Sequence, residues 1–154
     1  MPLSTWSILG CGYTGTALAR RLIAEGHRVI VTRRDPTAAR QLATELGAEA
    51  LALDLATVTA QAPSDSIVVC LAPPGAEPAT EAANLARFAA AARRLIYVSS
   101  TGVYAPGGGA WVDESWPLEP ATASGVQRLA FERALPARAI VLRAACIHGP
   151  VRGI

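Results

Sequence analysis

Six residues near the start of the chain form the pattern Gly10-Cys11-Gly12-Tyr13-Thr14-Gly15. They stand between a short apolar run and a segment with helical periodicity. In such a strand–turn–helix unit Gly10 permits the tight turn, Gly12 lets the backbone approach a pyrophosphate, and Gly15 lets the helix pack on the strand. The helix N-terminus offers phosphate its N–H groups and a partial positive charge. The pattern therefore predicts a dinucleotide site, and an ordinary strand-to-helix turn is the alternative.

The choice of dinucleotide is expected to depend on the residues that end the second strand. A site for NAD usually has an acid there, which accepts hydrogen bonds from the ribose hydroxyls. This chain has Thr32-Arg33-Arg34, and Asp35 comes only after the two arginines. Because a guanidinium pairs well with a 2′-phosphate, NADP(H) is favoured. In the alternative, both arginines are solvated, Asp35 binds the ribose, and the cofactor is NAD.

The elements that would position these residues alternate along the chain. Short β-rich apolar runs are followed by alanine-rich segments with helical spacing, which is typical of βαβ units around a parallel sheet. The strands are expected at residues 6–9, 28–32, 51–53, 66–71, 95–98 and 139–142. The helices are expected at residues 15–25, 36–47, 77–92 and 124–135. The sequence therefore predicts a doubly wound α/β Rossmann-type domain over residues 1–154.

Composition excludes several classes of protein. The chain has 154 residues, which suits a single domain, and only 17% of them are charged. The longest apolar run outside the alanines is far shorter than a membrane span, and no signal peptide is evident, so we expect a cytoplasmic protein. Its 14 basic residues are all arginines and include the scattered pairs Arg20–Arg21, Arg33–Arg34 and Arg93–Arg94, but they form no basic stripe, which argues against nucleic acid. Cys11, Cys70 and Cys146 match neither a disulfide framework nor a zinc pattern and are expected to be buried.

Further along the chain, several short motifs occur together in order. They are Gly12-Tyr13-Thr14-Gly15, Asp54-Leu55, Leu71-Ala72, Ser99-Ser100-Thr101-Gly102-Val103-Tyr104, Asp113-Glu114 with Pro117 and Pro120, and Leu142-Arg143 with Gly149-Pro150. Through these motifs the chain resembles the NAD-dependent epimerase/dehydratase family, the extended short-chain dehydrogenase/reductases, and more closely its atypical members. The resemblance extends over nearly the whole chain, and its most specific part is the segment 99–104.

The resemblance implies roles for individual residues. Asp54 would accept a hydrogen bond from the adenine amino group while Leu55 packs on the adenine ring. Leu71 and Ala72 would line the adenosine-phosphate side of the cofactor. Ser100 would face the nicotinamide as the active-site hydroxyl.

The chain departs from the family pattern in its catalytic pair. The family's Tyr-x-x-x-Lys pair falls at Ser124 and Arg128. Serine has no phenol to ionise, and arginine holds a charge but does not give up a proton. Tyr104 is a candidate replacement for the missing acid, although its family counterpart mostly packs beside the active-site loop. The first fingerprint glycine is also shifted, because Leu9 stands at its usual position.

A further departure is length, because family members continue into a region that closes over the substrate. The chain is expected to be either a truncated product, which the run 149–153 favours, or a minimal nucleotide-binding unit. Residues 105–123 form a long loop in which Trp111 and Trp116 either shape a pocket or pin the loop. The lone His27 and His148 are not expected to bind metal.

Together these observations predict an NAD(P)-dependent oxidoreductase or epimerase acting on a small substrate, with sugar derivatives among the candidates. The alternative is a non-catalytic dinucleotide-binding or sensor protein. Expected partners are NADP, or NAD in its place, and the small substrate, with neither nucleic acid nor membrane; a homodimer stays open. Ser100 and Tyr104 are the predicted catalytic residues. The predicted cofactor contacts are Gly10, Gly12, Tyr13, Thr14, Gly15, Arg33, Arg34, Asp54, Leu55, Leu71 and Ala72.

Overall fold

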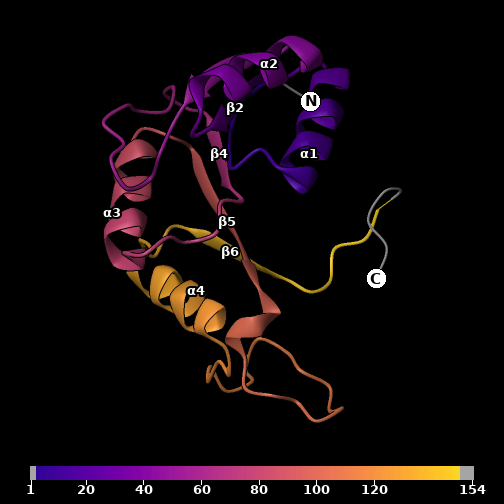
Figure 1. Cartoon of the computed structure of the whole chain (residues 1–154), viewed down its shortest axis with the longest axis vertical. Coiled ribbons are helices and arrows are strands. Elements are labelled where there is room, and N and C mark those ends of the chain that lie inside the picture. The colour runs from indigo at the N-terminus through magenta and orange to yellow at the C-terminus, as the bar shows by residue number, and fades with distance from the viewer. Residues whose placement is uncertain (1–2, 150–154) are drawn as a thin grey trace.

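A computed structural model describes residues 3–149 of the chain (Figure 1). The expectations that rest on Pro150 and on residues 151–153 therefore lie outside the described residues. In chain order the elements are β1 (Thr5–Leu9), α1 (Tyr13–Ala24), β2 (Arg28–Arg33), α2 (Pro36–Leu46), β3 (Glu49–Ala52), β4 (Ile67–Cys70), α3 (Pro78–Phe88), β5 (Arg94–Ser100), the 3₁₀ turn η1 (Thr101–Val103), α4 (Ala123–Ala134) and β6 (Ile140–Ala144).

The described strands form one parallel sheet in the order β3-β2-β1-β4-β5-β6. The chain winds outward from β1 to β3, returns to place β4 on the other side of β1, and then winds outward again. This confirms the predicted doubly wound α/β fold. The strand order reverses between β1 and β4, and ligands of open α/β sheets bind outside the carboxyl ends of the strands at such a switch point.

The helices cover the two faces of the sheet in pairs. Helices α1 and α2 pack on one face, and α3 and α4 pack on the other, as Figure 1 shows. The α1/α2 face has a core built around Ile8, Val31 and Leu22, all of which are buried. The α3/α4 face has a larger core in which Phe88 and Phe131 pack with Tyr97. The two cores therefore hold the helices against the two faces of the sheet.

Helix α3 is shorter than the alanine-rich sequence 77–92 predicts, because it ends at Phe88. After it the chain tightens into 3₁₀-type turns, in which the N–H of Ala92 donates to the carbonyl of Ala89. The Arg138 guanidinium then donates to the carbonyls of Ala89 (2.8 Å) and Ala92 (3.4 Å). Tertiary contacts at the helix end, together with the start of β5 at Arg94, therefore override the helical propensity of the alanines.

The cysteine prediction is correct for two of the three residues. Cys11 and Cys70 are buried free thiols, whereas Cys146 is exposed. Cys146 follows the end of β6, at the outer edge of the sheet, where none of the described helices covers the chain. No described helix is long and apolar enough to span a membrane.

Candidate functional site

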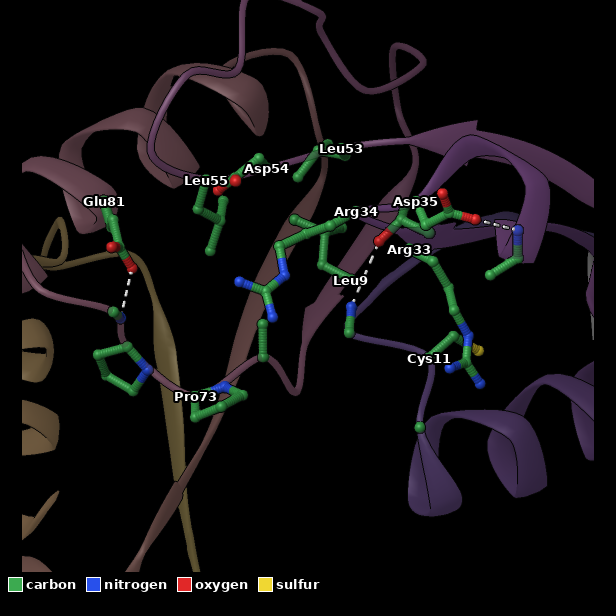
Figure 2. A pocket seen from close by; sticks show the side chains of 17 residues that line it. Leu9, Cys11, Arg33, Arg34, Asp35, Leu53, Asp54, Leu55, Pro73 and Glu81 are labelled. Carbon is green, nitrogen blue, oxygen red and sulfur yellow. Dashed lines mark hydrogen bonds between the residues drawn. The ribbon is translucent and has the colours of Figure 1, made fainter. Parts of the chain in front are cut away.

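A cavity of about 620 Å³ lies at the switch point of the sheet (Figure 2). Most of its wall is formed at the carboxyl ends of four strands: residues 9–12 at the end of β1, 32–35 at the end of β2, 53–55 after β3 and 72–75 after β4. Seven of the predicted cofactor residues line it: Gly10, Gly12, Arg33, Arg34, Asp54, Leu55 and Ala72. Tyr13, Thr14, Gly15 and Leu71 lie on the adjoining segments outside the lining, and Ser100 and Tyr104 lie on the next stretch after β5. The fold therefore brings segments from four different strands to one cavity.

The glycine-rich turn is built from three glycines with different surroundings. Gly10 has a φ of +76°, and a Cβ there would lie 2.5 Å from the amide nitrogen of Ala72. A Cβ on Gly15 would lie 3.3 Å from Ile8, so this glycine allows α1 to approach β1. At Gly12 the nearest atom to such a Cβ is the Gly10 carbonyl oxygen, 4.0 Å away. Among residues 3–149, no atom beyond the chain neighbours of Gly12 therefore lies closer than 4.0 Å to that position, which leaves open space beside this glycine.

Helix α1 begins directly after this open space. Gly12 occupies the N-cap and has no side chain to bond the first-turn N–H groups. Its carbonyl accepts the first helical hydrogen bond, from the N–H of Thr16 at 2.9 Å. The helix therefore presents its positive end to the mouth of the cavity, beside Gly12.

The two arginines after β2 point in different directions. Figure 2 shows Arg33 extending toward Cys11 and the start of α1, and Arg34 extending across the cavity toward Leu55 and Pro73. Both side chains are exposed, and no ion pair to either is found among the described residues. Two guanidinium groups are thus available to an anion at this edge of the cavity.

The Cys11 thiol beside Arg33 is held in its neutral form. Burial raises its pKa, and the hydrogen bond to Thr16 and the charge of Arg33 lower it more weakly.

Asp35 is already engaged in the fold. Its side chain is the N-cap of α2, where Oδ1 accepts from the N–H of Ala38 at 2.6 Å, and Pro36 occupies the first helical position. One carboxylate oxygen is therefore used by the helix, which leaves less of this group for a ribose. The Asp-Pro sequence is itself a signal for such a helix start.

Side chains of α3 hold the Asp54–Val58 segment through hydrogen bonds to its backbone. Leu55 is buried, while the Asp54 side chain is exposed and accepts from the N–H of Ala56 at 3.0 Å. The buried Asn84 amide donates to the carbonyl of Leu55 at 2.7 Å, and Arg87 donates to the carbonyl of Val58 at 3.1 Å. Helix α3 therefore fixes the position of the segment that follows β3.

The opposite wall contains residues that sequence reasoning missed. They are Pro73, Pro74, Gly75 and Glu81. Glu81 is 7% exposed, and its carboxylate accepts from the N–H of Gly75 at 2.8 Å (Figure 2). A Cβ on Gly75 would overlap that carboxylate in its present position, so a larger residue there would displace the Glu81 side chain. The Pro-Pro-Gly run signals a rigid loop, whereas a glutamate in a helix signals only solvent exposure.

Ser100 and Ser124 lie near the contact between η1 and α4. Ser100 ends β5, and its Oγ accepts from the N–H of Gly102 at 3.1 Å. Gly125 packs so closely on the carbonyl of Gly102 that a Cβ at position 125 would collide with it. Ser124 is exposed at the start of α4, and the charge of the half-buried Arg128 opposes only in part the rise that burial causes in the pKa of Tyr97 and of Cys70. The first turn of α4 is therefore seated against the loop that carries Ser100.

Tyr104 lies at the other end of η1, and Arg143 of β6 donates to its hydroxyl at 3.0 Å. The predicted catalytic hydroxyls thus stand at the two ends of one 3₁₀ turn. In the following loop, Trp116 Nε1 donates to the carbonyl of Ala105 at 3.1 Å, and Trp111 is 99% exposed. Trp116 therefore pins the base of the loop. Within residues 3–149 no group of His, Cys, Asp and Glu is arranged to hold a metal ion.

Comparison with known proteins connects this site to nicotinamide cofactors. Residues 5–101 match the model of the family described as "NADP oxidoreductase coenzyme F420-dependent". This is a different family from the one the sequence motifs resemble. A 40-residue stretch, 26% of the chain, is 50% identical to the Trk system potassium uptake protein TrkA of Streptomyces coelicolor and covers 18% of that protein.

The solved structures with the same fold include epimerases and dehydratases. A conserved protein of unknown function from Silicibacter pomeroyi is 33% identical over 97% of the chain, with a TM-score of 0.74. A candidate NAD-dependent epimerase/dehydratase from Methylobacillus flagellatus is 30% identical over 92% of it, with a TM-score of 0.69. UDP-glucose 4-epimerase from Bifidobacterium longum, solved with NAD⁺ and UDP, is 19% identical over 91% and shares the fold, with a TM-score of 0.70. The chain covers 56%, 54% and 52% of these three structures.

Proposed function

The chain belongs to the family described as "NADP oxidoreductase coenzyme F420-dependent", and from this premise we propose that it binds NADP(H) at the switch point of its sheet. The observation that carries the proposal is the pairing of open space over Gly12 with the two arginines that edge the same cavity. The pyrophosphate would lie on Gly12 and the α1 N-terminus, and Arg33 or Arg34 would pair with the 2′-phosphate.

The geometry favours NADP over NAD for two reasons. Asp35 caps α2, which leaves its carboxylate less available to the ribose hydroxyls of NAD. The guanidinium groups of Arg33 and Arg34 have no acidic partner among the described residues. An uncompensated cation at the edge of a cavity attracts the additional phosphate of NADP. The adenine would lie against Leu55, with Asp54 accepting from its amino group and Ala72 on the opposite wall.

We further propose that the bound cofactor serves oxidoreductase or epimerase chemistry on a small substrate, with sugar derivatives among the candidates. When bound, NADP(H) supplies or accepts a hydride. Ser100 and Tyr104 would hold the substrate oxygen, since each hydroxyl already accepts from a fixed donor and keeps its own proton for a further bond. The solved epimerases and dehydratases of this fold support the class of substrate.

The competing function is a dinucleotide-binding or sensor protein without catalysis. It is favoured by Ser124 and Arg128, which replace the catalytic tyrosine and lysine of the epimerase/dehydratase family that the motifs resemble. The short match to a potassium uptake protein favours it as well.

Titration with NADPH and NADH, followed by an assay for hydride transfer in the same sample, distinguishes the two. The assay panel should contain aldehydes, ketones, nucleotide sugars and coenzyme F420. Tighter binding of NADPH together with turnover supports the oxidoreductase. Tight binding without turnover supports the sensor, and binding of neither cofactor contradicts both.

A further inference from the structure

The hydroxyl of Tyr104 is held by a guanidinium that belongs to a different part of the chain. Arg143 Nη1 donates to Tyr104 Oη at 3.0 Å, and the guanidinium carbon lies 4.9 Å from the centre of the same ring. Tyr104 follows η1, whereas Arg143 comes from β6, 39 residues later. The contact therefore exists only because β6 pairs with β5, which brings Arg143 opposite Ser99.

Arg143 is itself fixed by a buried carboxylate on α4. Its Nη2 donates to Glu132 Oε2 at 2.9 Å and its Nε donates to the same oxygen at 3.2 Å. The Glu132 side chain is 5% exposed and that of Arg143 is 20% exposed. The pKa of Arg143 is raised, chiefly by the hydrogen bond to Glu132. A buried carboxylate needs such a partner, so the guanidinium has little freedom to leave.

This arrangement determines what the phenol can do. A guanidinium has donors and no acceptor, so Tyr104 Oη must accept from Arg143. The O–H of Tyr104 is then not used in the contact, and among residues 3–149 no acceptor takes its proton. Ser100 is in the same situation at the other end of η1, because its Oγ accepts from the N–H of Gly102. Both hydroxyls are thus left as donors for an external oxygen atom.

We infer that Arg143, locked by Glu132, is a positioning residue that presents Tyr104 as the proton donor to the substrate oxygen; this rests on the proposed oxidoreductase function. As a substrate C=O gains at carbon the hydride that bound NADPH would supply, its π electron pair moves to oxygen. The proton leaves Tyr104 Oη and forms the O–H bond of the alcohol. The phenolate left behind faces the Arg143 cation and regains a proton from solvent. In this way Tyr104 takes over the task that Ser124 does not perform.

The test compares Tyr104→Phe, Arg143→Met and Arg143→Lys in NADPH-dependent carbonyl reduction. General acid catalysis typically contributes roughly 10²–10⁴-fold, so the first two variants should each lower kcat about 100-fold or more. Arg143→Lys should recover most of the loss, since an ammonium also donates and carries charge. The Tyr104→Phe/Arg143→Met double variant should be no slower than either single variant, because both changes remove one function. The Kd for NADPH should stay unchanged.

Two further variants keep the test decisive. Arg28→Met is the control. It breaks another arginine–glutamate pair, the exposed one between Arg28 of β2 and Glu49 of β3, and should leave kcat unaltered. If Arg143→Met fails to fold with Glu132 unpaired, Glu132→Met/Arg143→Met removes both charges and should fold. It should still be as slow as Tyr104→Phe.

Separate results would overturn the inference and the proposed function. Full activity of Arg143→Met beside a slow Tyr104→Phe overturns the role of Arg143 and leaves the function standing. Losses that multiply in the double variant, without rescue by lysine, show that Arg143 acts only through the fold. Tight NADPH binding without turnover by the unmodified protein contradicts the catalytic function and the inference with it.

Discussion

At the scale of single residues, the proposed preference for NADPH rests on two arginines that have no ion-pair partner among residues 3–149. Arg33 and Arg34 diverge from the end of β2, so they reach two different parts of the cavity (Figure 2). A phosphate between them would meet charge from both sides. The adenosine of NAD has no 2′-phosphate, so on binding NAD at least one of the two guanidinium groups would stay exposed to water.

Replacing both arginines should therefore erase the preference for NADPH. A charge-assisted hydrogen bond contributes about 1.5–3 kcal/mol, so Arg33→Ala/Arg34→Ala should weaken NADPH binding roughly 10- to 100-fold and leave NADH binding nearly intact. Calorimetric titration measures both affinities, and the single variants show which arginine contributes more. Arg40→Ala on α2 is the control, because Arg40 lies outside the cavity. Equal affinity of the unmodified protein for the two cofactors contradicts the assignment.

Gly12 and Gly10 should respond in opposite ways to a side chain. Gly12→Val should abolish dinucleotide binding and lower the melting temperature less than Gly10→Ala does, because among residues 3–149 no atom beyond the chain neighbours lies closer than 4.0 Å to a Cβ at position 12. Gly10→Ala should instead destabilise the protein, because its φ is +76° and its Cβ would overlap Ala72. Thermal unfolding and NADPH titration of both variants measure the difference. Normal NADPH binding by Gly12→Val would show that the glycine pattern is only a turn.

At the scale of elements, α3 contributes to the cavity without providing a ligand for the pyrophosphate. Asn84 and Arg87 on one of its faces hold the backbone that follows β3, and Glu81 holds the loop that follows β4. Two walls of the cavity are therefore positioned by one helix. Shifting α3 would move the predicted adenine contacts together.

Removal of the Asn84 amide tests this dependence. Asn84→Ala leaves the buried carbonyl of Leu55 unpaired, which should cost about 1–3 kcal/mol in the free energy of unfolding. NADPH affinity should fall as well, because Asp54 and Leu55 lose their support. Arg21→Ala breaks only an exposed pair with Glu25 and should change stability by less than about 0.5 kcal/mol. Unchanged NADPH affinity in a destabilised Asn84→Ala would show that the segment does not contact the cofactor.

The sequence predicted these elements well where the pattern was local. The apolar run 66–71 predicts a strand buried on both faces, which the structure places at Ile67–Cys70, and Pro36 and Gly47 mark the ends of α2. The Gly10–Gly15 turn was recognisable because its chemistry depends on consecutive residues. Prediction was poorest where a residue far along the chain determines where an element ends. At the end of α3, for example, Arg138 donates to the carbonyl of Ala92, 46 residues earlier in the chain.

The same limit applies to the candidate site. Tyr104 and Ser100 belong to one short motif, so the sequence placed them together. Arg143 and Glu132 have no sequence signal that joins them to Tyr104, because only the pairing of β5 with β6 and the packing of α4 create the contact. Glu81 was missed for a similar reason, since its burial depends on the loop at Gly75.

At the scale of the whole molecule, the larger core contains two ionisable groups that the fold keeps neutral. Burial raises the pKa of Cys70 from 9.0 to about 12 and that of Tyr97 from 10.0 to about 12. The Tyr97 hydroxyl is buried near the Arg128 guanidinium without a hydrogen bond of good geometry, while its ring packs on Phe131 with a centroid distance of 4.6 Å. Between about pH 9 and pH 12 the unfolded chain therefore loses protons that the folded chain retains.

Stability should fall across that alkaline window. Each group can lower the free energy of unfolding by up to about 1.4 kcal/mol per pH unit once the pH exceeds its unfolded pKa. Tyr97→Phe keeps the ring and removes one titrating group, so the decline between pH 10 and pH 12 should become shallower. At pH 7 the variant should be as stable as the unmodified protein or more stable, because the lost hydroxyl had no hydrogen bond of good geometry. Cys146→Ser should not change the profile, since that thiol is exposed. Urea unfolding at intervals from pH 7 to pH 12 measures all three proteins, and an unchanged alkaline slope in Tyr97→Phe would mean that Tyr97 ionises as readily in the folded chain as in the unfolded one.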